Sequence, residues 1–220
     1  MSSYILKILE TSYVTHDAKR FRIEKPDNYT FIPGQGTQVA INLPEWKDKF
    51  REFSFTSVNE AKYLEFTIKI YTDHDGVTKQ LGKTNAGVEL IIQEPYGNIV
   101  FKDDGVFIAA GSGITPFISI FRTLHKQKKL KKCSLIYSNR TAADIIYYPE
   151  LLKMFGNRYI NILTQEQSIG FMKNRIDRNY LIENIQNFSQ DFYVCGPDNF
   201  VTSVTGLLLE LGATADTLIF

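Results

Sequence analysis

The sequence predicts a two-domain β + α/β protein, with an antiparallel β-barrel over residues 1–102 and a parallel-sheet α/β domain over residues 103–220. In the first part, short β-rich runs are separated by turn residues at the spacing that is typical of small antiparallel barrels. In the second part, apolar strand candidates alternate with helical stretches, which is the βαβ rhythm of a parallel sheet. A length of 220 residues accommodates two modest domains.

The first half contains alternating or β-rich runs that read as strands, bounded by glycine, proline and asparagine turns. The strand candidates cover residues 4–13, 18–23, 37–42, 51–57, 63–71 and 88–93. A short helical stretch is expected at residues 79–81, directly after a glycine turn. Six strands with one short helix predict the antiparallel barrel.

The second half begins after the turn residues Asp103, Asp104 and Gly105. Its strand candidates cover residues 106–109, 133–137, 159–163 and 192–194, with a last strand at 216–219. Helical spacing of apolar residues predicts helices over 117–128, 148–155, 177–185 and 199–211. This order predicts a Rossmann-like parallel sheet with helices between its strands.

The composition excludes several classes of protein. The chain is 44% hydrophobic and 22% charged, with a net charge of +1, so we expect no nucleic-acid partner and no membrane-surface partner. We read the lysine-rich run at 126–132 as a solvated helix end rather than a docking patch. Cys133 and Cys195 are too far apart in sequence to form a metal site unaided, and they fit the reduced thiols of a cytoplasmic protein. No secretory signal and no apolar stretch of membrane-spanning length are visible.

The most informative feature is a glycine turn after the apolar strand at 106–109. Gly111 and Gly113 permit a tight turn and a close approach of a ligand to the backbone, and Pro116 suits the first position of the next helix. A helix N-terminus that follows a strand and a glycine turn directs N–H groups at an anion, which predicts a phosphate site. The alternative is that the glycines serve only a compact strand–helix connection.

A second turn, Cys195-Gly196-Pro197, follows the strand at 192–194 and precedes a helix. The carboxyl ends of parallel strands meet at one edge of a sheet, where ligands of open α/β sheets bind. We therefore expect the two glycine turns to border one crevice.

The barrel half carries two further candidate sites. On the strand at 51–57, Arg51 and Phe53 share one face and Ser54 lies on the other. A guanidinium suits phosphate and an aromatic ring can cover a planar ligand, although a lone strand aromatic is more often part of a core. Residues 76–78, Gly-Val-Thr, precede the short helix and offer a second helix N-terminus to an anion.

Together these motifs resemble the ferredoxin–NADP⁺ reductase superfamily of flavin oxidoreductases over nearly the whole chain. Residues 51–54 are similar to the family's Arg-x-Tyr-Ser flavin motif, with Phe53 in place of tyrosine. Residues 76–78 resemble its Gly-x-Ser/Thr element, and residues 111–116 and 195–197 resemble its nicotinamide-nucleotide turn and its late Cys-Gly-Pro. Residues 137–140 resemble the segment near the adenosine ribose.

The resemblance implies an FAD-binding barrel, an NAD(P)-binding α/β domain and no metal, with FMN still open as the flavin. The catalytic residues would be Ser54, which would hydrogen-bond near the flavin N5, and Cys195, which would approach the nicotinamide C4. The implied cofactor-binding residues are Arg51, Phe53, Ser54, Thr67, Ile68, Lys69, Ile70, Gly76, Val77, Thr78, Gly111, Gly113, Thr115, Pro116, Ser138, Arg140, Cys195, Gly196 and Pro197.

The same resemblance assigns parts of the ligands to these residues. Arg51 would pair with the flavin pyrophosphate and residues 76–78 would cap it. Phe53 would lie against the isoalloxazine, and the backbone of residues 67–70 would face the flavin ring and ribityl chain. Thr115 and Pro116 would lie where the nicotinamide meets the flavin.

Two departures from the family's pattern limit the expectation. Phe53 lacks the tyrosine hydroxyl, which removes a hydrogen bond to the ribityl chain. The sequence stops at Phe220, directly after its last strand candidate, whereas relatives often continue with an aromatic residue that can cover the flavin.

The resemblance implies a cytoplasmic, monomeric oxidoreductase that passes electrons from NAD(P)H through bound FAD to a transient ferredoxin, flavodoxin or oxygenase partner. Two alternatives remain, namely an NAD(P)H:flavin reductase that acts on free flavin and a non-catalytic nucleotide-binding or regulatory module. Ser138, Arg140 and Arg175 favour NADPH, but Gln165 stands where many NADPH-using relatives carry arginine. We therefore expect a coenzyme preference below about tenfold.

Overall fold

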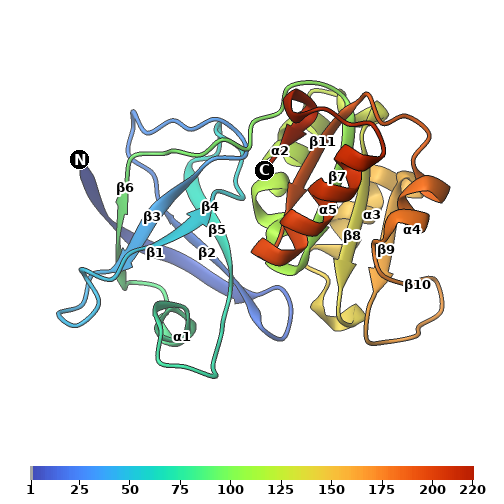
Figure 1. The fold of residues 1–220 in the computed structure, drawn as a ribbon. Coiled ribbons are helices and arrows are strands. Elements are labelled where there is room, and N and C mark those ends of the chain that lie inside the picture. The colour runs from blue at the N-terminus through green and yellow to red at the C-terminus, as the bar shows by residue number, and fades with distance from the viewer. Residues whose placement is uncertain (1) are drawn as a thin grey trace. The chain divides into compact units, whose positions relative to one another are not determined.

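A computed structural model describes residues 2–220. The chain forms two compact units (Figure 1). The first unit contains the chain up to Val100 together with residues Thr115–Thr123, and the second contains Phe101–Ile114 and Leu124–Phe220. The first turns of helix α2 (Thr115–Lys126) therefore count with the strands of the first unit.

The first unit is a six-stranded antiparallel sheet in the order β4-β3-β6-β1-β2-β5. Its strands are β1 (Ser3–Tyr13), β2 (Ala18–Glu24), β3 (Gly36–Ile41), β4 (Arg51–Ser54), β5 (Tyr63–Lys69) and β6 (Glu89–Gln93). The two edge strands approach one another, because Phe55 forms an antiparallel bridge with Phe66 and the Thr56 N–H donates to the Glu65 carbonyl at 2.7 Å. The sheet is thus a nearly closed barrel, which confirms the predicted fold class of this half.

The barrel interior is filled by the alternating apolar residues of its strands, as a half-buried antiparallel sheet requires. Phe21, Phe66 and Leu90 are fully buried there, and Phe55 stacks on Phe31 with ring centroids 4.3 Å apart. The short helix α1 (Val77–Lys83) adds Val77 and Leu81 to the same core. Burial of these two side chains fixes the first turn of α1 against the barrel.

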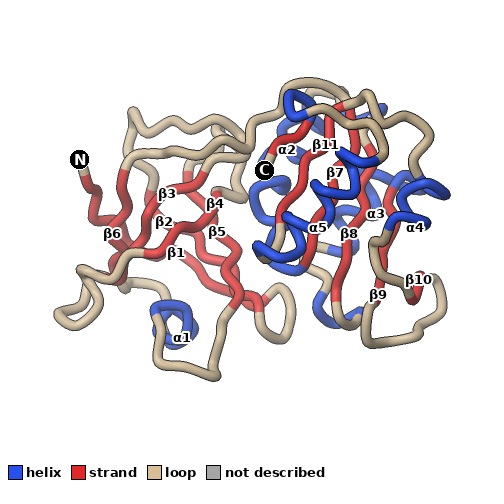
Figure 2. The backbone as a smooth tube through the Cα atoms, viewed as in Figure 1, coloured by secondary structure: helices blue, strands red, loops and turns tan. Residues whose placement is uncertain are grey.

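The second unit is a six-stranded parallel sheet in the order β10-β9-β8-β7-β11-β12 (Figure 2). Its strands are β7 (Gly105–Ala110), β8 (Ser134–Asn139), β9 (Tyr159–Leu163), β10 (Met172–Lys173), β11 (Asp191–Cys195) and β12 (Leu218–Ile219). The helices that follow its strands are α3 (Tyr148–Phe155), α4 (Arg178–Asn184) and α5 (Asp198–Glu210). Tyr180 and Leu181 of α4, and Val204 and Leu208 of α5, pack with the strands in one buried cluster. The predicted α/β architecture of this half is confirmed.

Three of the boundaries that differ from the sequence-based expectation have a clear structural setting. The strand predicted over 51–57 ends at Ser54, because the chain then turns toward β5 and bridges it at Phe55. A 3₁₀ turn, Gly111–Ile114, precedes α2, so Pro116 is the second residue of the helix and not the first. The last strand is only Leu218–Ile219, because reciprocal hydrogen bonds between Thr214 and Thr217 hold a 3₁₀ turn directly before it.

No helix within residues 2–220 is both long and apolar enough to cross a bilayer. Neither cysteine is in a disulfide. Cys133 is fully buried, and this burial raises the pKa of its thiol to about 11, so it is protonated at neutral pH. Cys195 is half-buried at the end of β11.

Candidate functional site

The two glycine turns of the second unit lie beside each other. Strand β7 is the centre of the sheet, with β8 on one side and β11 on the other, so the chain changes direction across the sheet at β7 (Figure 1). Ligands of open α/β sheets bind outside the carboxyl ends of the strands at such a topological switch point. The turn Gly111–Ile114 follows β7, and residues 195–197 follow β11, so both turns border this position.

Contact between the turns depends on Gly113. A Cβ atom at this position would lie 2.5 Å from both the carbonyl carbon of Cys195 and the nitrogen of Gly196, so only glycine allows the backbones to touch. Gly111 has φ +53°, and a Cβ there would meet no atom within 4 Å. The Tyr137 hydroxyl donates to the Gly111 carbonyl at 2.8 Å, which fixes the turn to β8. The two turns therefore meet at one edge of the sheet, and the crevice expected between them stays a prediction.

A pocket of about 310 Å³ opens beside the ends of β8 and β9. Its lining residues include Ser138, Thr164 and Arg175, together with Asn199 and Ser203 on the first turns of α5. One guanidinium and several hydroxyl and amide groups thus share one cavity, which is a donor set that suits a sugar hydroxyl or a phosphate.

The pocket includes two of the three residues that were expected to favour NADPH, Ser138 and Arg175. Arg140 is not among its lining residues. Its guanidinium is 3.3 Å from the Asp144 carboxylate, and its side chain is 56% exposed. Burial raises the pKa of Asp144, but hydrogen bonds from Thr141 and Arg140 outweigh this effect and leave that pKa below its ordinary value.

Sequence reasoning missed two polar groups that line this pocket, Asn199 and Ser203, and a third, Glu166, that contacts the loop after β8. The Glu166 carboxylate accepts a hydrogen bond from the Ala142 N–H at 2.9 Å, which holds it against the loop after β8. Asn199 and Ser203 lie one helical turn apart at the start of α5. Helical spacing counted from the Cys-Gly-Pro turn would have identified these two residues.

In the first unit, Arg51, Phe53 and Ser54 lie on β4, which pairs with β3 through Thr37↔Phe53 and Gly36↔Ser54. Arg51 is exposed, and its guanidinium donates to the carbonyl of its neighbour Phe50 at 2.7 Å. Within residues 2–220 no carboxylate forms an ion pair with Arg51, so its charge is available to an anion. Phe53 is half-buried and packs on the barrel core.

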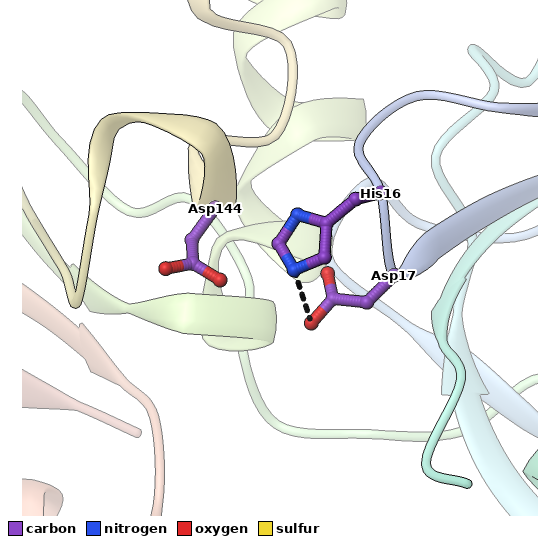
Figure 3. Close-up of side chains that lie close together, drawn as sticks. All are labelled: His16, Asp17 and Asp144. Atoms are coloured by element: carbon purple, nitrogen blue, oxygen red, sulfur yellow. Dashed lines mark ion pairs between the residues drawn. The ribbon is translucent and has the colours of Figure 1, made fainter.

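The predicted flavin-facing segment, residues 67–70, lies at the end of β5. The side chains of Thr67, Ile68 and Ile70 are buried, and the Ile70 N–H donates to the Asp17 carbonyl at 2.7 Å. The Lys69 ammonium pairs with the Asp17 carboxylate at 2.9 Å, and Nε2 of His16 lies 3.6 Å from the same carboxylate (Figure 3). Because these side chains are already engaged or buried, the backbone is the part of this segment that suits a ligand.

Residues 76–78 begin α1, with Gly76 at the N-cap. The Gly76 N–H donates to the His74 carbonyl at 3.1 Å, whereas the first-turn N–H groups of Val77 and Thr78 have no acceptor within the helix itself. The acidic neighbours are paired, since Asp73 is 2.8 Å from His74 and Asp75 is 3.2 Å from Lys79. The hydrogen bond from His74 lowers the pKa of Asp73.

Thr115 and Pro116 form the start of α2. The Pro116 carbonyl accepts a hydrogen bond from the Ser119 hydroxyl at 3.2 Å, and the oxygen of that hydroxyl accepts from the Gly34 N–H at 2.9 Å. Thr115 is nearly buried, at 9% exposure. The structure thus attaches the predicted nicotinamide-contacting end of α2 to a loop of the barrel.

Comparison with known proteins finds relatives of both the nucleotide-binding unit and the whole chain. Residues 107–206 match the family model described as an oxidoreductase NAD-binding domain. The anthranilate 1,2-dioxygenase electron transfer component of Acinetobacter baylyi is 28% identical over 216 residues, which cover 92% of this chain and 60% of that protein. The flavohemoprotein of Bacillus subtilis is 24% identical, over 88% of this chain and 53% of its own length.

Two solved structures share the fold of nearly the whole chain. One is the flavohem-like FAD/NAD-binding domain of nitric oxide dioxygenase from Vibrio cholerae, with a TM-score of 0.85, 20% identity, and coverage of 98% of this chain and 96% of that one. The other is a ferredoxin NADP⁺ reductase from Neisseria gonorrhoeae, solved with bound FAD and NADP, with a TM-score of 0.84, 22% identity, and coverage of 98% and 94%.

Residues 107–206 thus match an oxidoreductase NAD-binding domain, and the chain as a whole shares the two-unit fold of a ferredoxin NADP⁺ reductase, as the resemblance of its motifs implied. It spans 60% and 53% of the lengths of the two curated relatives described above. Those relatives are therefore longer proteins, and this chain matches only part of each.

Proposed function

We propose that the chain is an FAD-dependent NAD(P)H oxidoreductase that passes electrons to a separate ferredoxin, flavodoxin or oxygenase component. The observation that carries the proposal is the contact between Gly113 and the Cys195–Gly196 backbone at the topological switch point. It brings the two turns expected to hold a nicotinamide nucleotide to the place where open α/β sheets bind such ligands. The name of the A. baylyi relative, an electron transfer component of a dioxygenase, supports a transient partner of the oxygenase kind.

The residues of the first unit fit a flavin nucleotide. Arg51 presents an exposed guanidinium with no carboxylate partner among residues 2–220, and Phe53 presents a half-buried ring on the same strand. We assign residues 1–102 to flavin binding and 103–220 to nicotinamide-nucleotide binding, with Thr115 and Pro116 of α2 close to the reacting end of the nicotinamide.

A bound flavin supplies the redox chemistry, because it accepts a hydride from a reduced nicotinamide and releases electrons to a carrier. The chain's own residues bind and orient. Arg51 would neutralise charge on the pyrophosphate, the N–H groups of Val77 and Thr78 would donate to it, and the Ser54 hydroxyl would donate a hydrogen bond at the hydride-accepting edge. Cys195 would contact the nicotinamide ring, and proximity and orientation of the two rings would provide the main rate acceleration. The two thiols outside any disulfide fit a cytoplasmic location, which we also propose.

Cofactor analysis tests this proposal. We expect the purified or reconstituted protein to hold about one FAD per chain, identified by mass analysis of the released cofactor. Release of FMN instead would indicate a flavin that is bound by the barrel alone. Loss of the flavin on desalting would favour the alternative of a reductase that acts on free flavin. A chain that binds no flavin after reconstitution with either nucleotide would contradict the proposal.

The coenzyme preference depends on the pocket at Ser138 and Arg175. We expect kcat/KM for NADPH and NADH to differ by less than about tenfold, equivalent to about 1.4 kcal/mol. Arg175→Ala should lower kcat/KM for NADPH by about tenfold and that for NADH by less than about twofold, because only NADPH carries a 2′-phosphate for the guanidinium. Arg140→Ala is the matched variant, and it should change the NADPH value in the same direction but less, since Arg140 is paired with Asp144. Equal losses for both coenzymes in Arg175→Ala would contradict this role.

A further inference from the structure

One buried ionic cluster joins four segments of the first unit. We call it the Glu65–Arg122 cluster, and it consists of Thr56, Glu65, Arg122 and Arg22. Nη1 of Arg122 on α2 donates to Oε1 of Glu65 at 2.6 Å and to the Thr56 carbonyl at 2.7 Å. The Thr56 hydroxyl donates to the same carboxylate oxygen at 3.0 Å, and Nε of Arg22 donates to the other at 3.0 Å.

The carboxylate at the centre of this cluster is ionised although it is buried. The Glu65 side chain is only 2% exposed. Burial raises the pKa of Glu65, but the charge and hydrogen bond of Arg122, with those of Arg22 and Thr56, outweigh it and hold that pKa below its ordinary value. The cluster is therefore a fully hydrogen-bonded charge pair, whose geometry is more restricted than that of an apolar contact.

Three of the four segments that the cluster joins carry residues of the proposed site. Thr56 lies two residues after Ser54, and Glu65 lies two residues before Thr67. Arg122 is on α2, six residues after Pro116. The cluster thus fixes the spacing of three segments that are distant in sequence.

Helix α2 is attached to the barrel at a second point on the same face. Ser119 precedes Arg122 by three residues, so the two side chains are neighbours on the helix surface. Ser119 is fully buried, and its hydroxyl connects the Gly34 N–H with the Pro116 carbonyl. Gly34 has φ +104°, where a side chain would be strained, so the loop can approach α2 only with glycine at this position.

We propose that Glu65 and Arg122 are positioning residues that hold Ser54, Thr67 and the Thr115–Pro116 end of α2 in the arrangement that hydride transfer requires. The inference rests on the proposed function and deepens it, because neither residue is expected to touch a ligand. A misplacement of about 1 Å at a reacting centre can cost about 100-fold in rate, so a remote cluster that fixes three segments has a large effect on catalysis.

A purely stabilising role makes a different prediction. Removal of one partner leaves a buried unpaired charge and destabilises a protein, whereas replacement of both partners by apolar residues of similar volume is often neutral. The double variant Glu65→Met/Arg122→Met should therefore remain folded, and Arg22 keeps its ion pair with Glu10 at 3.0 Å. The double variant therefore distinguishes an effect of the cluster on the position of the site residues from an effect on the stability of the protein.

The matched control is Arg20→Met. Arg20 lies on β2 and pairs with Glu10 at 2.5 Å, and its side chain is 22% exposed, close to the 21% of Arg122. This variant removes an arginine of similar burial from the barrel, and the guanidinium of Arg20 bonds to Glu10 rather than to α2.

The test measures amide hydrogen exchange of the α2 segment in the cofactor-free protein, and then the rate of anaerobic flavin reduction at saturating NAD(P)H. In the double variant we expect exchange of the Thr115–Thr123 amides to be at least about tenfold faster and flavin reduction at least about tenfold slower, with an unchanged KM. Arg20→Met should alter both rates by less than about twofold.

Unchanged α2 exchange in the double variant would overturn the inference, whether or not the protein proves to be a flavoenzyme. Faster exchange with an unchanged reduction rate would overturn the positioning role as well. If the parent protein binds flavin but NAD(P)H does not reduce it, the proposed function fails, while the exchange measurement still decides whether the cluster holds α2.

Discussion

Replacement of Gly113 by alanine is expected to lower the free energy of unfolding by about 2–3 kcal/mol, because the added methyl group cannot fit without a backbone shift. Its Cβ would lie 2.5 Å from the carbonyl carbon of Cys195 and from the Gly196 nitrogen, and neither atom can move as a side chain can. The shift would separate the two turns at the switch point, so binding of NAD(P)H should be lost with the stability. Urea unfolding followed by circular dichroism and a nucleotide titration measure the two effects.

Gly206→Ala is the matched control. Gly206 lies within α5, and a Cβ there would meet nothing within 4 Å. Alanine is a better helix former than glycine, so this variant should be more stable by about 0.5–1 kcal/mol and should bind nucleotide normally. If Gly113→Ala unfolded at the urea concentration of the parent protein, the turn-to-turn contact would not be required.

Arg51→Ala is expected to weaken flavin binding by about 2–3 kcal/mol, which corresponds to an increase in Kd of about 30- to 150-fold. The reason is that the exposed guanidinium has no competing carboxylate among residues 2–220 and would give a charge-assisted bond to a pyrophosphate. Titration of the cofactor-free protein with FAD, followed by flavin fluorescence, measures the change.

Lys49→Ala controls for a general loss of positive charge near β4. Lys49 is close in sequence to Arg51, and its ammonium lies 4.2 Å from the centroid of the Trp46 ring, so its removal should change the flavin Kd by less than about twofold. If Arg51→Ala retained FAD as tightly as the parent protein, the guanidinium would not bind the pyrophosphate.

The sequence predicted the elements of both units where a single periodicity was sustained. The alternation at residues 18–23 and 63–71 became β2 and β5, and helical spacing predicted α3 over 148–155 as the structure has it. These features depend on local residue order and burial alone. The two-residue strand β10 was missed, because Met172 and Lys173 are both exposed and show no pattern.

The contacts that assemble the candidate site join residues that are distant in the sequence, and no local sequence pattern predicts them. The alternation of residues predicted a strand up to residue 57. In the structure this strand ends at Ser54, because the barrel closes through the bridge between Phe55 and Phe66. The approach of Gly113 to Cys195 depends on β7 and β11 being neighbours in the sheet, although the two residues are far apart in sequence. The roles of individual site residues stay predictions, because the fold places them without a ligand.

Charged side chains were the hardest to assign from sequence. Arg140 looked as suitable for a 2′-phosphate as Arg175, but the structure pairs Arg140 with Asp144 and places Arg175 beside Ser138. No sequence pattern distinguishes Arg122 or Glu65, because a lone arginine in a helix and a lone glutamate in a strand are typical of surface residues. Only the tertiary structure shows that they meet in a buried cluster.

Anaerobic reduction of the bound flavin by a nicotinamide nucleotide tests the central claim most directly. The reconstituted protein is mixed with NADH or NADPH in the absence of oxygen, and its visible flavin absorbance is followed before and after addition of an oxidised carrier. We expect at least one of the two nucleotides to bleach the flavin, and the carrier to restore its colour. A protein that binds FAD but keeps its oxidised spectrum in excess NADH and in excess NADPH would contradict the account.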